Sequence, residues 1–123
     1  MKLLIATFNH QRCYYMIIVK SKNGIPLRLT DERWKHIITS HLDMVSNKEK
    51  LLETVKDPDM ILKGVSDELR AIKFFQQTRL GPKYLVVAYK ELSKENGFII
   101  TAYKTSRINK ITRRGIIWKK LKC

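Results

Sequence analysis

Runs of apolar residues along the chain predict more strands than helices. One apolar and aromatic run covers residues 13–19, and a shorter run covers residues 25–29. Asn23-Gly24 stands between them, a dipeptide typical of the tight turns of β-hairpins. The pattern therefore predicts a hairpin near the N-terminus. Pro26 has no amide hydrogen to donate, so the second strand is expected to start there or to lie at a sheet edge.

A helix is expected directly after this hairpin. Thr30 offers an N-cap hydroxyl, and Asp31 and Glu32 follow in the first turn, where carboxylates interact favourably with the helix dipole. At about 100° per residue, one face collects apolar residues and one histidine, whereas His36 points away from it. The predicted inward face comprises Trp34, Ile37, Ile38, His41, Leu42 and Val45.

A second, shorter helix is expected after the cap residue Asn47, ending at Asp57-Pro58-Asp59 because proline breaks the pattern. The rest of the chain has strand-like segments separated by turns such as Glu95-Asn96-Gly97. These segments cover residues 60–65, 70–76, 84–90, 98–105 and 116–118. Short connections favour an antiparallel meander. The predicted fold class is α+β, with an N-terminal hairpin and one or two helices packed on one face of a curved antiparallel sheet and the opposite face open.

The length of 123 residues suits a single domain, residues 1–123, with a basic C-terminal tail over 106–123. The longest apolar run, residues 14–19, is too short to cross a membrane, and the N-terminus lacks the apolar length of an export signal. Cys13 and Cys123 fit neither a disulfide framework nor a metal-ligand set. We therefore expect a cytoplasmic protein with no membrane association and no cofactor.

Net charge indicates the class of partner. The chain has 25 Lys and Arg against 11 Asp and Glu, a formal charge of +14. Residues 1–30 carry five basic groups and residues 104–123 carry eight, with no acid in either stretch. Such a field attracts polyanions through counterion release, so nucleic acid is the predicted partner. A solubilising surface and an anionic membrane surface are the alternatives.

Motifs of metal-dependent or nucleophilic catalysis are not found in the sequence. It contains no glycine-rich phosphate loop, no nucleophile elbow and no HExxH, and His36 and His41 are five residues apart rather than four. Histidines and many cations instead suit metal-free RNA cleavage, because the ribose 2′-hydroxyl is a built-in nucleophile and imidazole can exchange protons near neutral pH.

The segment 98–105 would present a polar face. With a two-residue period, Phe98, Ile100 and Ala102 face the core, whereas Thr101, Tyr103 and Thr105 face the open side, where hydroxyls can bind phosphate and a ring can stack on a base. An ordinary solvated strand face explains the same pattern. Likewise, His41 could be a core histidine, His36 a surface residue and Arg79 a free surface charge rather than a phosphate ligand.

Four segments carry a resemblance to a known family. They are LTDERWKHI (residues 29–37), HLDM (41–44), TVKDPDMI (54–61) and FIITAY (98–103). Together they resemble the barnase/EndoU/colicin/RelE-like nuclease superfamily, in particular its phage- and mobile-element-associated branch, over roughly residues 14–105. This resemblance implies helices before a curved antiparallel sheet and metal-independent endoribonuclease activity in toxins that act on tRNA, mRNA or ribosome-bound RNA. It points to His36, His41, Thr101 and Tyr103 as site residues.

The sequence thus predicts a small basic endoribonuclease, the toxin of a toxin-antitoxin or phage-linked system, that leaves a 2′,3′-cyclic phosphate. Either histidine would act as acid or base, while Thr101 and Tyr103 orient the scissile nucleotide. The predicted phosphate-binding residues are Arg33, Lys35, Arg79, Lys104 and Arg107. An acidic antitoxin or immunity protein would cover the open face.

Two other functions stay open. One is a non-catalytic RNA- or ribosome-binding module that uses the same surface. The other is a DNA-binding regulator with residues 47–56 as recognition helix, against which the acidic Glu49 and Glu53 argue.

Overall fold

The computed structural model describes residues 2–9, 12–76 and 81–121 of the chain. It confirms the α+β fold class. The described strands form one sheet in the order β1-β2-β3-β7-β6-β5-β4-β8. The strands are β1 (Lys2–Asn9), β2 (Arg12–Lys20), β3 (Pro26–Thr30), β4 (Met60–Lys63), β5 (Leu69–Phe75), β6 (Lys83–Ser93), β7 (Asn96–Thr105) and β8 (Ile116–Lys119). The helices are α1 (Asp31–Ser40), η1 (Leu42–Met44), α2 (Lys48–Lys56), α3 (Ile108–Ile111) and η2 (Thr112–Arg114).

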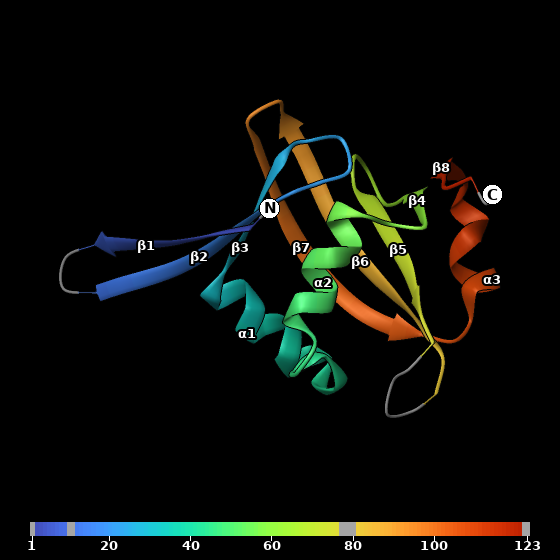
Figure 1. The fold of residues 1–123 in the computed structure, drawn as a ribbon, viewed down its shortest axis with the longest axis horizontal. Helices are drawn as coiled ribbons and strands as arrows, with labels where there is room; N and C mark the ends of the chain where they lie inside the picture. Colours follow the sequence, from blue (N-terminus) through green and yellow to red (C-terminus); the bar gives the residue numbers. More distant parts are fainter. Residues whose placement is uncertain (1, 10–11, 77–80, 122–123) are drawn as a thin grey trace.

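Neighbouring strands pair antiparallel throughout this sheet except at β3 and β7, which run parallel. The meander β4-β5-β6-β7 confirms the antiparallel order predicted from the short connections. The sequence pattern did not predict β1, which pairs with β2 alone. Figure 1 shows β1 and β2 as a ribbon that extends away from the rest of the molecule.

The hairpin β2-β3 is confirmed, but its turn differs from the expected tight one. Asn23-Gly24 lies inside a longer loop, residues 21–25. The amide of Gly24, at φ 83°, donates to the carbonyl of Ser21 (2.9 Å). Glu91 of β6 accepts hydrogen bonds from the Ser21 hydroxyl (2.5 Å) and the Asn23 amide (3.0 Å). This carboxylate therefore fixes the loop against a strand far away in the sequence.

Helix α1 begins as predicted. The hydroxyl of Thr30 accepts a hydrogen bond from the amide of Arg33 (3.0 Å), which satisfies one of the free donors of the first turn. Trp34 and Ile37 are buried, with exposed fractions of 8% and 0%. The apolar face of the first two turns was thus correctly predicted.

The last part of that predicted face is wrong. Helix α1 ends at Ser40, where His41 takes a non-helical conformation and the chain continues into η1. Because the helical step is lost there, Leu42 and Val45 point outward and are 78% and 63% exposed, whereas Met44 is buried in their place.

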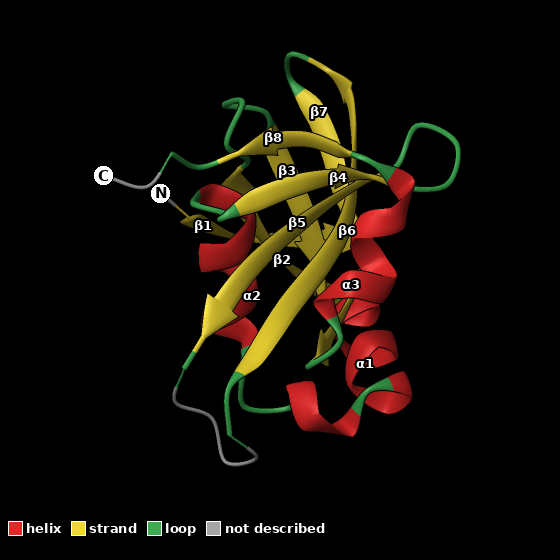
Figure 2. Cartoon of the chain, turned by 90° about the vertical axis from the view of Figure 1, so that its right-hand side faces the viewer, coloured by secondary structure: helices red, strands yellow, loops and turns green. Residues whose placement is uncertain are grey.

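The sheet is covered on both faces. Helices α1 and α2 pack on one face over the main core, to which α2 contributes Leu51, Leu52 and Val55. On the other face lies a smaller buried cluster, which consists of Leu62, Ile72 and Val86. Ile108 and Ile111 of α3 pack against this cluster, and Figure 2 shows α3 beside β6, away from α2. The prediction of an open second face is therefore wrong where α3 lies.

The segment named as a basic tail contains α3, η2 and β8, and β8 covers the strand expected over residues 116–118. Strand β8 pairs with β4. The Lys120 amide donates to the Asp59 carbonyl (2.8 Å), and the Lys120 ammonium contacts Asp57 (3.1 Å). The Lys22 ammonium lies 4.2 Å from the centroid of a Trp118 ring, so the β2-β3 loop reaches a strand at the opposite edge. This contact requires a strongly curved sheet. No helix among the described residues is long and apolar enough to cross a membrane.

Replacing Tyr89 by Phe is expected to stabilise the fold. Tyr89 is fully buried, its hydroxyl has no hydrogen-bond partner among the described residues, and burial, assisted by Glu91, raises its pKa. Because removing an unpaired buried hydroxyl abolishes its desolvation cost, Tyr89→Phe should raise the free energy of unfolding by about 1 kcal/mol. Urea denaturation measures the difference. A loss of stability would show that the hydroxyl is satisfied.

Candidate functional site

The structure brings His41 and Tyr103 together. Their ring centroids are 5.8 Å apart, with an angle of 35° between the rings. His41 is half-buried at the end of α1, where its amide donates to the Ile37 carbonyl (2.8 Å). Tyr103 is half-buried on β7 and packs against the cluster around Val86. An imidazole and a phenol from distant parts of the sequence thus meet beside β7.

Thr101 shares a face with Tyr103, although the predicted alternation of β7 is only half correct. Ile99 and Ala102 both belong to the main core. They do so because the register with β6 shifts between Ile99 and Thr101, which leaves Ile100 as the extra residue of a bulge. Before the bulge the predicted faces are reversed, and after it Thr101 and Tyr103 lie on the face opposite Ala102, as predicted.

His36 belongs to a different place. It is exposed, as the helical wheel predicted, and lines an open hollow of about 510 Å³ along α1. The other lining residues are Thr30, Glu32, Arg33, Lys35 and Thr39. Lys35 also forms an ion pair with Asp31 (3.1 Å). The four predicted site residues therefore divide. His36 lies in this hollow with the predicted phosphate ligands Arg33 and Lys35, whereas His41, Thr101 and Tyr103 lie outside its lining.

Lys104 follows Tyr103 along β7 and faces the opposite side of the sheet, the side of α2. Burial lowers the pKa of its ammonium, the nearby Asp43 carboxylate opposes this shift, and the positive charges of Lys50 and Lys83 add to it. Lys104 thus lies among other cations rather than beside a paired acid.

The remaining predicted phosphate ligands occupy separate positions. Arg107 is exposed at the start of α3, and its amide donates to the hydroxyl of Thr105 (3.0 Å). Arg79 lies outside the described residues.

An aromatic pair near Tyr103 was missed. The rings of Phe74 and Tyr84 lie with centroids 5.0 Å apart, and Phe74 is 41% exposed. Tyr84 packs against the same small cluster as Tyr103 and pairs in register with Thr105. The two-residue period of β5 and β6 could have placed Phe74 and Tyr84 on one face, but only their register reveals that they are neighbours.

The described residues contain no group of three or more His, Cys, Asp and Glu side chains that could hold a metal ion.

Searches of known protein families, curated proteins and solved structures find no match to this chain. Its function must therefore be argued from its own residues.

Proposed function

We propose that this protein is a metal-independent endoribonuclease whose centre is the His41-Tyr103 pair. The contact between the half-buried imidazole and the phenol, 5.8 Å between centroids, carries the proposal. Partial burial limits the freedom of both rings, while His41 keeps access to solvent. The charge of +14 supports a polyanionic substrate.

The chemistry uses the nucleophile that RNA itself supplies. A neutral imidazole of His41 accepts the proton of a ribose 2′-hydroxyl, and that oxygen forms a bond to the adjacent phosphorus. The bond from phosphorus to the 5′-oxygen breaks, and the leaving oxygen takes a proton from an acid or from water. The products are a 2′,3′-cyclic phosphate and a 5′-hydroxyl. The hydroxyls of Tyr103 and Thr101 would orient the phosphate by hydrogen bonds.

Cations on both sides of this centre would hold the flanking RNA. Lys104 and Arg107 lie near the end of β7, and Arg33 and Lys35 line the hollow beside His36. The substrate would be tRNA, mRNA or ribosome-associated RNA in the cytoplasm. A cell that makes such an enzyme has to block it, so the role of a toxin in a toxin-antitoxin or phage-linked system, with an acidic antitoxin or immunity protein, belongs to the proposal.

Incubation of the protein with RNA in excess EDTA tests this function. Cleavage is expected to continue in the chelator and to produce ends with 2′,3′-cyclic phosphate. A substrate with deoxyribose at the cleaved position should stay intact, because it lacks the attacking hydroxyl. Cleavage that stops in EDTA, or that proceeds on the deoxyribose substrate, would contradict the mechanism.

A non-catalytic RNA- or ribosome-binding module is the second candidate. The pair Phe74-Tyr84 favours it, because an exposed ring on a basic protein can stack on an unpaired base without any catalytic group. Binding of RNA with no cleavage under any of these conditions would support this module over the enzyme.

A further inference from the structure

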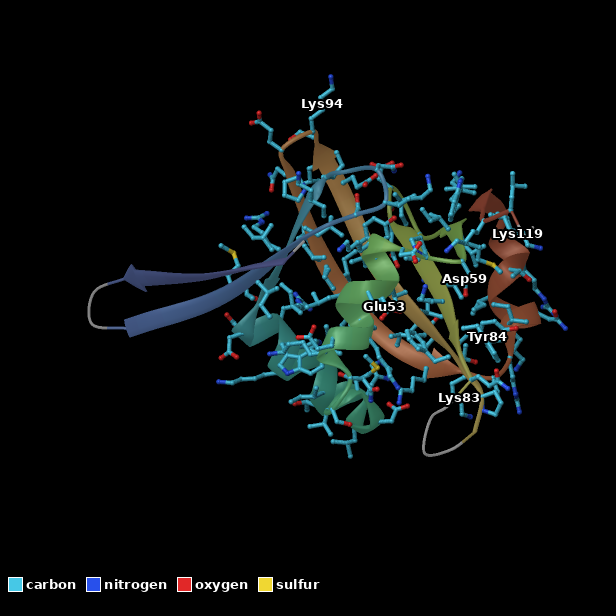
Figure 3. All side chains as sticks on the ribbon, in the orientation of Figure 1. Glu53, Asp59, Lys83, Tyr84, Lys94 and Lys119 are labelled. Carbon is cyan, nitrogen blue, oxygen red and sulfur yellow. The ribbon has the colours of Figure 1, made fainter. Side chains whose placement is uncertain are left out.

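Three lysines converge at one end of the sheet. They are Lys50 of α2, Lys83 of β6 and Lys104 of β7, here called the lysine cluster. With Phe75 and Leu85 they form one surface region, which has no enclosed space for a water molecule. The Lys50 ammonium lies 5.3 Å from the Phe75 ring centroid. Figure 3 shows Lys83 at the lower end of the sheet, far from Lys94 at the upper end.

The lysine cluster differs from Lys73 and Lys120 because it lacks a close acid. Lys73 and Lys120 each contact Asp57, at 3.4 and 3.1 Å. Among the described residues, no carboxylate forms an ion pair with any member of the cluster, and Asp43 acts on Lys104 only as a nearby charge. The arrangement therefore places three positive charges near one carboxylate, which offsets them only in part.

This concentration of charge has a cost that an anion can remove. Lys104 is half-buried, and both its burial and the neighbouring Lys50 and Lys83 lower its pKa. Three ammonium groups offer up to nine N–H donors and no acceptor, which suits the oxygen atoms of a phosphate. A bound phosphate would relieve the repulsion among the three charges.

We propose that the lysine cluster binds a backbone phosphate of RNA, as a subsite beyond the scissile bond. The proposal rests on the proposed function for its choice of ligand. Lys104 follows Tyr103 in β7, and successive strand residues face opposite sides, so the cluster and the His41-Tyr103 pair lie on the two faces at the same end of this strand. An RNA strand that crosses this end of the sheet contacts both.

A matched pair of triple variants tests the subsite. One carries Lys50→Gln, Lys83→Gln and Lys104→Gln, and the control carries Lys20→Gln, Lys63→Gln and Lys94→Gln, all at exposed positions. Both lose three positive charges. The ligand is a fully 2′-O-methylated single-stranded RNA, which binds without being cleaved. Loss of the cluster should weaken binding roughly 10- to 100-fold and reduce the slope of log K against log salt by about 0.7, the value for one phosphate of a single strand. The control should weaken binding by less than about 3-fold.

Equal losses in the two triple variants would overturn the proposal. Titration with inorganic phosphate, followed by NMR of the Leu85 amide, separates the possible sources of the anion. If phosphate binding depends on the cluster but the triple variant keeps its RNA affinity, the cluster is a site for free anions. This result also overturns the proposal. If the triple variant does not fold, Lys50→Gln and Lys83→Gln are measured singly, each with an expected loss of about 3-fold.

The same experiment keeps the subsite separate from the proposed function. RNA binding that depends on the cluster, with no cleavage of unmodified RNA, would contradict the nuclease and leave the subsite standing. Cleavage of unmodified RNA, with an RNA affinity that does not change when the cluster is removed, would contradict the subsite and leave the nuclease standing.

Discussion

His41→Ala is expected to reduce the rate of RNA cleavage by about 10²- to 10⁴-fold, the usual contribution of a positioned acid or base. The reason is that no other imidazole described here contacts Tyr103. Single-turnover cleavage of an RNA oligonucleotide in EDTA measures the rate. Binding of 2′-O-methylated RNA by the variant should stay within about 3-fold of wild type, since the alanine removes no charge that holds phosphate.

His36→Ala provides the matched control. It removes the same kind of side chain from an exposed position within α1, and it should change the cleavage rate by less than about 10-fold, the effect of a lost contact rather than a lost base. If His36→Ala strongly slowed cleavage and His41→Ala did not, the catalytic centre would instead lie in the hollow around Arg33 and Lys35. Full activity in both variants would remove histidine from the mechanism.

Much of the fold was predictable because local signals specify it. Thr30 is a cap whose hydroxyl bonds within its own first turn, and Pro58 ends α2 through a restriction on its neighbour. Both effects act within a few residues, so the sequence reveals them directly. The five strands predicted after α2 were correct for the same reason, since apolar runs bounded by turn residues are local patterns.

The parts that were missed depend on distant partners. Strand β1 is held only by β2, and α3 is a single turn held by Ile108 and Ile111 against the second face. Neither segment has a sustained hydrophobic period in its sequence from which it could have been predicted. The end of α1 at Ser40 was missed as well, because apolar residues continue beyond it and Met44, rather than Leu42, reaches the core.

The candidate site was predictable as a set of residue types and not as a geometry. His41 and Tyr103 were both named, but only the packing of η1 beside β7 brings them together. Lys50 and Lys83 were not singled out, because a lysine on a helix or at a strand end usually serves as a solvated charge. Their convergence with Lys104 follows from the register that pairs Leu85 with Lys104.

The role of Gly97 also depends on distant partners that the sequence does not reveal. This residue is the basis of the prediction with the largest effect on stability. The sequence suggested a turn at Glu95-Asn96-Gly97, but Ser93 pairs with Asn96, so Gly97 lies in β7 itself. There it pairs with Leu27 of the parallel strand β3. Glycine is needed because the Lys90 carbonyl of β6 and the Leu27 side chain of β3 approach closely, not because the chain turns.

Gly97→Ala is expected to lower the free energy of unfolding by about 3 kcal/mol, at the upper end of what overpacking costs. A Cβ atom at this position would lie 2.6 Å from the carbonyl oxygen of Lys90 and 2.7 Å from Cδ2 of Leu27. A side-chain methyl can move aside, but a paired backbone carbonyl cannot without breaking the strand register. The melting temperature should fall by about 10 °C, as measured by scanning calorimetry alongside urea denaturation.

Asn96→Ala is the control, because it changes an exposed neighbour and should shift stability by no more than about 0.5 kcal/mol. Stability of Gly97→Ala equal to that of Asn96→Ala would show that the Lys90 carbonyl and the Leu27 side chain do not approach Gly97 as closely as the structure indicates. That outcome would also affect the site, because β3 runs directly into α1. The junction of β3 and β7 sets where α1 begins, and hence how close His41 at its end lies to Tyr103.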